Sequence, residues 1–460
     1  MTYKRFLVVV GFVFSMLPLS TANALGLCKC LPAHLRDKPL TLVELSNLAL
    51  DCNPNSKLAW AEAKAAWATL GIAESVFWPQ IDAVATYNDN SLRQNDKTTH
   101  QFSHATGVSM NFLIWDFGVS LAKAKSAKWQ MRAAQFNQNY TLQQIVLQVE
   151  QTYYNLIAAR ALVESNKVAL KEAELNYKTA EGLRAQGVAV IGDVYQAKSA
   201  LLQAEYAVTQ AEGSESVYEG QLLTDIGIPI TEKIKLAPIP DTFQTCKMIG
   251  TIDAMMDYAT DSRPDLLAAK AQVESAEETL LAAKRAVLPT ITLSTLTENI
   301  HTTKGLAALT TNSGTLGNGL SNSIQFSFSM PIFTGFSNTY NIRLAEAQRQ
   351  QSIAQYNALA QQIDFQVWQY YYNIKTAAES MDSSKSLVTS TKQAAAQAFG
   401  QYKEGVGTIL NVLTTQASAR LARAQFIQSK MNWFVSLAQF SASIGNTVRD
   451  TTHPDLFYPF

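Results

Sequence analysis

Apolar and polar residues alternate with a period of two in two stretches of the chain. The longer stretch sets Ile324, Phe326, Phe328, Met330 and Ile332 against Gln325, Ser327 and Ser329, and the other carries Val108, Met110, Phe112 and Ile114. Successive side chains of a strand point to opposite faces, so both stretches are typical of strands with one apolar face. A shorter partner with the same period follows Pro289. We therefore predict two β-hairpins, at about residues 80–116 and 290–334.

The alternation gives way to helical spacing after each predicted hairpin. Apolar residues then recur at gaps of three and four, and no proline interrupts the chain from Val119 to Ile228 or from Ile332 to Thr452. The apolar seam consists of Leu142, Val146, Val149, Tyr153 and Leu156 in the first half, and of Ile363, Val367, Tyr370 and Ile374 in the second. Such a seam is typical of coiled coils. It predicts two long helical hairpins, at about 119–226 and 337–443, whose first helices of about 65 residues would be roughly 100 Å long.

The two halves of the chain repeat one another. Pro54 and Pro79 match Pro264 and Pro289 at an offset of 210 residues. Further on the offset becomes 218, and it pairs Gly187-Val188 with Gly405-Val406 and Gly227 with Gly445. The change places an eight-residue insertion between residues 297 and 320, where Gly, Asn, Thr and Ser are typical of a loop. We assign repeat 1 to residues 41–227 and repeat 2 to residues 251–445, with a linker at 228–250 between them.

The first 24 residues have the pattern of a secretory signal peptide. Lys4 and Arg5 precede an apolar run, and the small-residue sequence Ala22-Asn23-Ala24 follows it. A retained membrane anchor is the alternative, but the run is shorter than the roughly 18 to 20 apolar residues that a span needs. We expect cleavage after Ala24 and export, which leaves an N-terminal segment at 25–40 and a C-terminal tail at 446–460. Acylation of Cys28 is disfavoured, because Leu27 is larger than the small residue that a lipidation site places before its cysteine.

Composition excludes several classes of function. The chain has 37 basic and 37 acidic side chains, and loss of the signal peptide leaves a net charge of −2, so no nucleic-acid partner is indicated. The five histidines are scattered, and the sequence contains no phosphate loop or nucleophile elbow. We therefore expect neither an enzyme nor a metal or cofactor site. Beyond the signal peptide no stretch is long and apolar enough for a membrane helix, so a membrane would have to be crossed by strands.

Four cysteines lie outside the long helical segments, namely Cys28, Cys30, Cys52 and Cys246. In an exported protein they permit disulfides, and three sets of pairings are possible. The spacing of Cys28-Lys29-Cys30 is too short for the usual zinc pattern. We treat all four as candidates for structural disulfides.

Taken in order along the chain, these elements resemble the TolC-like outer-membrane efflux proteins, also called outer membrane factors. The resemblance is carried by the segment Tyr402-Lys403-Glu404-Gly405-Val406-Gly407-Thr408-Ile409-Leu410-Asn411-Val412-Leu413 and by the helix boundaries at Asn53-Pro54 and Trp78-Pro79. It is also carried by the order helix, strand pair, long helix, tip and helix, which occurs twice across about residues 42–445. The resemblance implies a mainly α fold with a membrane β-barrel, in which three chains form a continuous α/β-barrel tunnel.

The resemblance also implies a location and partners. The homotrimer would lie in outer-membrane lipid with a long periplasmic extension, and it would dock on a periplasmic adaptor protein and an inner-membrane pump of the RND, ABC or MFS type. It would serve efflux or type I secretion as a passive conduit that opens at its periplasmic tip. The alternative is a periplasmic adaptor-like protein, which would carry one helical hairpin where this chain carries two.

The resemblance places the functional residues at the tips of the helical hairpins. Gly187, Val188, Gly405, Val406 and Gly407 allow tight turns between helices and are the candidates for adaptor docking. The candidates for a constriction of the tunnel are Asp193, Gln196, Tyr402, Asn411 and Thr414. Relatives often narrow the tunnel with acidic side chains, whereas only one of these five positions is acidic here. This acidic residue is Asp193, and the sequence fits a role for it as a helix N-cap equally well.

Overall fold

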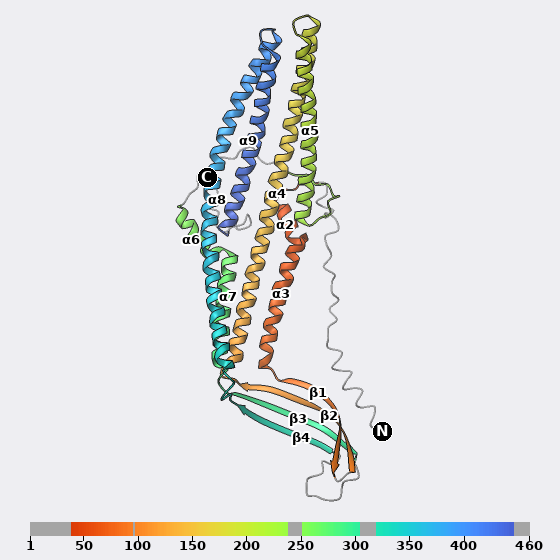
Figure 1. The fold of residues 1–460 in the computed structure, drawn as a ribbon, viewed down its shortest axis with the longest axis vertical. Helices are drawn as coiled ribbons and strands as arrows, with labels where there is room; N and C mark the ends of the chain where they lie inside the picture. Colours follow the sequence, from red (N-terminus) through yellow and green to blue (C-terminus); the bar gives the residue numbers. More distant parts are fainter. Residues whose placement is uncertain (1–37, 95–96, 238–250, 304–318, 446–460) are drawn as a thin grey trace.

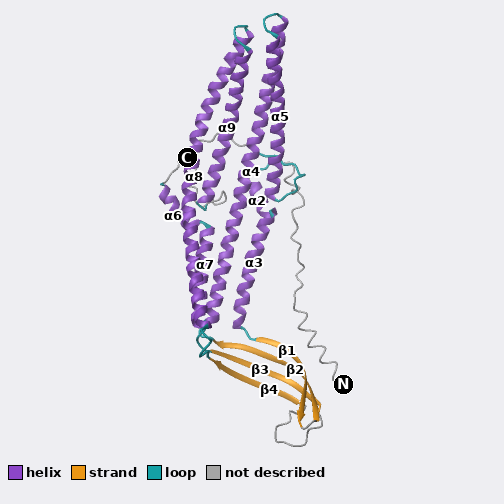
Figure 2. Ribbon diagram, viewed as in Figure 1, coloured by secondary structure: helices purple, strands orange, loops and turns teal. Residues whose placement is uncertain are grey.

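The computed structural model describes residues 38–94, 97–237, 251–303 and 319–445. These residues form an elongated molecule, with a four-stranded sheet at one end and two pairs of long helices that extend to the other (Figures 1 and 2). The signal peptide, Cys28, Cys30, Cys246 and the tail at 446–460 lie outside the described residues, as do most of the linker and of the insertion loop. Among the described helices, none combines the length and the apolarity needed to cross a lipid bilayer.

The helices follow the same order in both repeats. The first repeat contains α2 (Leu42–Cys52), α3 (Pro54–Glu74), the 3-10 turn η3 (Ser75–Phe77), α4 (Val119–Ala185) and α5 (Ile191–Ile226). The second contains α6 (Ile252–Ser262), α7 (Pro264–Arg285), α8 (Ser337–Lys403) and α9 (Ile409–Ser443). The helices α4 and α8 have 67 residues each. We call the pair α4 and α5 hairpin 1, and the pair α8 and α9 hairpin 2. The fold is the mainly α, twice-repeated arrangement that the sequence predicts.

A proline separates the two short helices that open each repeat. Pro54 and Pro264 lie in the first turn of α3 and α7, where an N–H group would have no intrahelical partner. The side chain of Asn53 accepts a hydrogen bond from the N–H of Asn55 at 2.7 Å and thereby caps α3. Its amide Nδ2 donates to the carbonyl of Asp225 at 2.6 Å. This second bond attaches the start of α3 to the end of α5.

The strands β1 (Gln80–Gln94), β2 (Lys97–Trp115), β3 (Thr290–Thr303) and β4 (Gly319–Ser329) form one antiparallel sheet in the order β1-β2-β3-β4. The pairing of β2 with β3 joins the hairpin of repeat 1 to that of repeat 2. Strand β4 ends at Ser329, whereas the alternation predicts a strand through Ile332. Pro331 follows directly after Met330 and has no N–H group to donate to the ladder, which accounts for the earlier end.

The sheet has one apolar face along the rows nearest the helices. The register places Phe112, Leu293 and Phe326 beside one another, and Asn111, Ser294 and Gln325 form the adjacent row on the opposite face. Phe326 is 71% exposed, and its neighbours Ile324 and Phe328 are exposed as well. The chain itself therefore leaves this apolar face uncovered.

The core is divided into separate clusters along the helices. One cluster packs α2 against hairpin 1, and an equivalent one packs α6 and α7 against hairpin 2. A third cluster joins the repeats, because Ala158 of α4 packs with Ile374 of α8 and with Met431, Trp433 and Phe434 of α9. The first two clusters therefore stabilise each repeat separately, and the third joins the two hairpins.

Candidate functional site: the hairpin tips

The turn at the end of each hairpin is built on one left-handed glycine. Gly187 and Gly405 both have a φ of +75°. The N–H of Val188 donates to the carbonyl of Leu183 at 2.9 Å, and that of Gly187 donates to the carbonyl of Arg184 at 3.0 Å. These two bonds form a Schellman motif, which ends a helix on a left-handed residue and favours glycine there. Hairpin 2 ends in the same way.

The two turns touch one another. A methyl carbon of Val188 lies 3.5 Å from the position that a Cβ would take on Gly405. Val406 is 80% exposed, and Val188 is exposed too. At Gly407 a Cβ would lie 3.0 Å from the backbone nitrogen of Tyr402, so this glycine permits the close packing of the turn. The predicted docking residues therefore lie together at the end of the molecule remote from the sheet (Figure 1).

An apolar cluster joins the hairpins below the tips. It contains Ala180, Val194 and Ala197 of hairpin 1 and Ala398, Tyr402, Ile409 and Val412 of hairpin 2. Tyr402 is only 3% exposed, and its hydroxyl has no hydrogen-bond partner within the described residues. Burial raises the pKa of Tyr402, and the charge of Asp193 raises it further. Tyr402 therefore fills the contact between the hairpins, and its role at a constriction stays a prediction.

The other constriction candidates lie around this cluster. Asp193 is the third residue of α5, and its carboxylate accepts a hydrogen bond from the N–H of Val190 at 3.3 Å. It is therefore not the N-cap residue, although it does stabilise the helix start. Gln196 lies one turn further along α5, while Asn411 and Thr414 are exposed near the start of α9. None of these four side chains is fully buried.

Two polar links cross from hairpin 1 to hairpin 2 below the apolar cluster. Arg423 of α9 binds Glu172 of α4, with 2.8 Å between Nη2 and Oε1. Asn176 of α4 donates to the side-chain carbonyl of Gln416, and the amide of Gln416 points back to Asn176. Glu172, Asn176 and Gln416 also border an open groove between the hairpins, which Gln196 lines from α5. These links join the two hairpins beside the groove.

These link residues are not among the site residues that the sequence predicts. One signal was available, because Asn176 lies three residues after Ala173 and four before Ala180, on a seam that is otherwise apolar. A polar residue at a seam position generally needs a partner on the facing helix. Its partner Gln416 is 240 residues away along the chain, so sequence spacing alone does not identify it.

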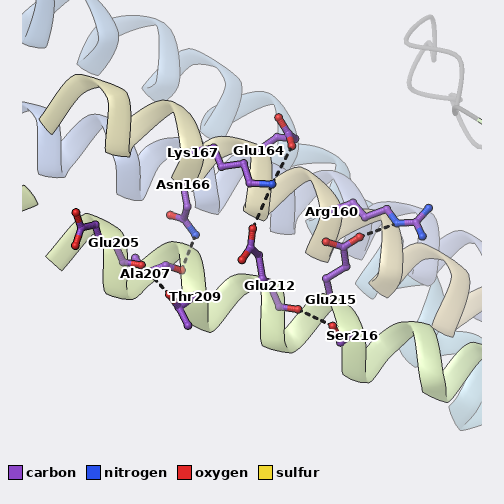
Figure 3. A network of polar contacts seen from close by, with 10 residues as sticks. All are labelled: Arg160, Glu164, Asn166, Lys167, Glu205, Ala207, Thr209, Glu212, Glu215 and Ser216. Carbon is purple, nitrogen blue, oxygen red and sulfur yellow. Dashed lines mark hydrogen bonds and ion pairs between the residues drawn. The ribbon is translucent and has the colours of Figure 1, made fainter. Parts of the chain in front are cut away.

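Hairpin 1 has its own ion pairs along its length (Figure 3). Arg160 of α4 contacts Glu215 of α5 at 3.1 Å, and Lys167 contacts Glu212 at 3.3 Å. All four side chains are partly exposed, so each pair contributes little to stability. Both pairs lie within one hairpin, in contrast to the pair between Arg423 and Glu172.

Of the four candidate cysteines, the structure describes only Cys52. It lies at the end of α2, is buried and is disulfide-bonded. The helix α2 lies near the middle of the rod, far from the tips (Figure 1).

Comparison with known proteins identifies the family. A family model described as "Outer membrane efflux protein" matches residues 45–224 and 256–446. Protein CyaE of Bordetella pertussis is 24% identical over 432 residues, which are 93% of this chain and 88% of that protein. Outer membrane protein TolC of Vibrio cholerae is 22% identical over 444 residues, which are 94% of this chain and 95% of that protein.

A solved structure shares the fold. The CmeC outer membrane channel of Campylobacter jejuni matches with a TM-score of 0.77 at 19% identity, over 89% of this chain and 87% of that one. The family model covers both repeats, which favours a channel over an adaptor with one hairpin, and the members of this family are channel proteins rather than enzymes. The chain belongs to the outer membrane efflux protein family, and it is an outer-membrane channel of an efflux or secretion system.

Proposed function

We propose that three copies of this chain close into one tube that crosses the outer membrane and continues through the periplasm. Within the described residues β1 and β4 are the edges of the sheet, and four strands are too few to close a barrel. If β1 of one copy pairs with β4 of the next, the contact is heterologous and closes a ring. The uncovered apolar face then meets lipid. The polar face, with Asn111 and Gln325, then lines the water-filled interior.

The tube would end at the tips, where it docks on a periplasmic adaptor and an inner-membrane pump. The observation that carries this proposal is the contact between the two turns at the far end of the helical rod, held by few interactions. A few weak links can be separated by a partner that binds them. The protein is then a passive conduit, with its free energy of opening supplied by docking.

The first test measures the mass of the purified protein in detergent and its conductance in planar lipid bilayers. A trimer that forms discrete channels would support the proposal. A monomer without conductance would contradict it, because a single chain cannot close the sheet.

Proline at the tip glycines should block export. In Gly187→Pro and Gly405→Pro the ring holds φ near −65°, far from the observed +75°, and removes the N–H that closes the helix end. We expect export to fall by at least about tenfold, with trimer mass unchanged, because a strained turn costs several kcal/mol locally. Asparagine tolerates the left-handed conformation, so Gly187→Asn and Gly405→Asn are matched controls that should export normally. Normal export by both proline variants would remove the tips from the mechanism.

Removal of the Asp193 charge should reduce cation preference if this residue borders the pore. In a trimer Asp193 gives a ring of three carboxylates, which raises the local cation concentration. Asp193→Asn keeps the size of the side chain, so its effect on the reversal potential in a salt gradient reports the charge alone. An unchanged reversal potential would leave Asp193 with only its role at the start of α5.

A further inference from the structure

Two histidines lie side by side in the sheet, far from the tips. His104 of β2 and His301 of β3 are direct cross-strand partners in the antiparallel register. Their imidazole rings are stacked, with centroids 5.2 Å apart and planes inclined by 28°. Both side chains are exposed. In the sequence the two histidines are 197 positions apart, and the register that joins them depends on the pairing of the two repeats.

The histidine pair occupies the outer part of the sheet face that becomes apolar toward the helices. Tyr87 is the cross-strand partner of His104 on its other side, and its ring stacks on that of Phe102 at 6.4 Å between centroids. Because β2 and β3 are the two central strands, the neighbouring chain in a ring would contact β1 and β4 and leave the pair open.

The height of the pair places it at the border of the membrane. Ten residues of β2 separate His104 from Ile114, which is about 33 Å of extended strand. With the tilt that strands have in barrels this corresponds to roughly 25 Å along the membrane normal, about the height of the apolar band of such proteins. This placement rests on the proposed function, whereas the pairing of the two rings does not. At the border water reaches the imidazoles, and a tyrosine and a phenylalanine beside them are typical of the aromatic girdle.

We propose that His104 and His301 together bind one divalent transition-metal ion of the zinc class. Imidazole is a preferred ligand of zinc, copper and nickel, and direct cross-strand partners have Cβ atoms about 5 Å apart, which lets both rings turn their nitrogens to one ion. Within the described residues no cluster of three or more His, Cys, Asp or Glu side chains is placed to hold a metal. Water therefore fills the remaining positions, and the site is open and binds moderately. The bound ion joins β2 to β3, the strand pair that connects the two repeats.

The experiment is a calorimetric titration of untagged, thiol-alkylated, chelator-treated protein with zinc chloride. We expect one ion per chain in the wild type and an affinity at least about tenfold weaker in His104→Asn and in His301→Asn, since each variant keeps one ligand of two. The matched control is His100→Asn on the same strand, whose cross-strand partner is Ser91, and it should bind as the wild type does. A wild type that binds no zinc would overturn the proposal, as would a double variant, His104→Asn with His301→Asn, that binds with unchanged affinity.

Two further measurements show why a variant fails to bind zinc. The mass of each variant in detergent shows whether it is assembled, so lost binding cannot be mistaken for lost folding. A heat-unfolding midpoint that rises with zinc in the wild type but not in the double variant would support the link between β2 and β3. Conductance is not part of this test, so the metal site and the channel proposal can fail independently.

Discussion

Replacement of Arg423 by alanine should make the channel easier to open. We expect the fraction of time that single channels spend in the high-conductance state to increase several-fold, because the variant breaks the ion pair to Glu172 that joins the hairpins below the tips. A partly exposed pair contributes about 1 kcal/mol, which is about a fivefold change in the ratio of joined to separated hairpins. In the proposed trimer, three such links would act together. Single-channel recording of the purified protein measures the effect directly.

The control for this prediction lies in the same molecule. Arg160→Ala also removes an arginine from an ion pair, but the pair with Glu215 lies within hairpin 1, so channel opening should not change. Exchange of the charges in Glu172→Arg with Arg423→Glu should restore the behaviour of the wild type. If Arg423→Ala and Arg160→Ala have equal effects, the link between the hairpins does not control opening.

Local rules account for most of the fold. Long helices follow from a seam that no proline interrupts. The glycines at 187 and 405 are explained because helices often end on a residue in the left-handed conformation, which glycine adopts most easily. The internal repeat adds a check, because a feature that recurs at a fixed offset is independent support for the same element. Each of these signals is a pattern in the residues themselves, so a single sequence is enough to find it.

The site was less predictable, because its contacts are remote along the chain. Tyr402 is a polar aromatic residue near the tip, and a residue of this type at this place is a natural candidate to line a pore. Only the packing of hairpin 1 against it explains its burial. The partners Asn176 and Gln416 belong to different repeats. The fixed offset pairs each residue of repeat 1 with the residue at the same place in repeat 2. Contacts between the repeats join residues at different places, such as Asn176 and Gln416. This is why the elements at the tip could be predicted and its links could not.

Protonation of Glu150 should make the protein more stable in mild acid than in mild base. This side chain of α4 is 4% exposed, and one of its carboxylate oxygens has no hydrogen-bond partner within the described residues. Burial raises the pKa of Glu150 from 4.5 to about 7. One turn further along α4, Tyr154 stacks on Phe434 at 5.0 Å between centroids, so the surroundings are aromatic. The carboxyl group therefore lies one turn from a contact between the repeats, in a buried site that favours its neutral form.

The sign of the pH effect follows from the two pKa values. Between pH 4.5 and 7 the folded chain holds the proton of Glu150 and the unfolded chain has lost it, so the free energy of unfolding decreases as pH rises through this window. Above pH 7 the folded state contains a buried charge, at a cost of about 3 kcal/mol per chain. The heat-unfolding midpoint of the wild type should thus be higher at pH 5 than at pH 8. Glu150→Gln cannot ionise, so we expect it to lose most of this difference.

Comparison of pH 5 with pH 8 within each variant separates ionisation from packing. Glutamine also places an amide in the buried site, which shifts stability equally at both pH values and cancels in the difference. Glu62→Gln on α3 removes an exposed carboxylate and should keep the pH dependence of the wild type. An equal pH dependence in Glu150→Gln and the wild type would mean that Glu150 keeps its charge in the folded state. Its burial would then have to be compensated by a cation or water between the two repeats.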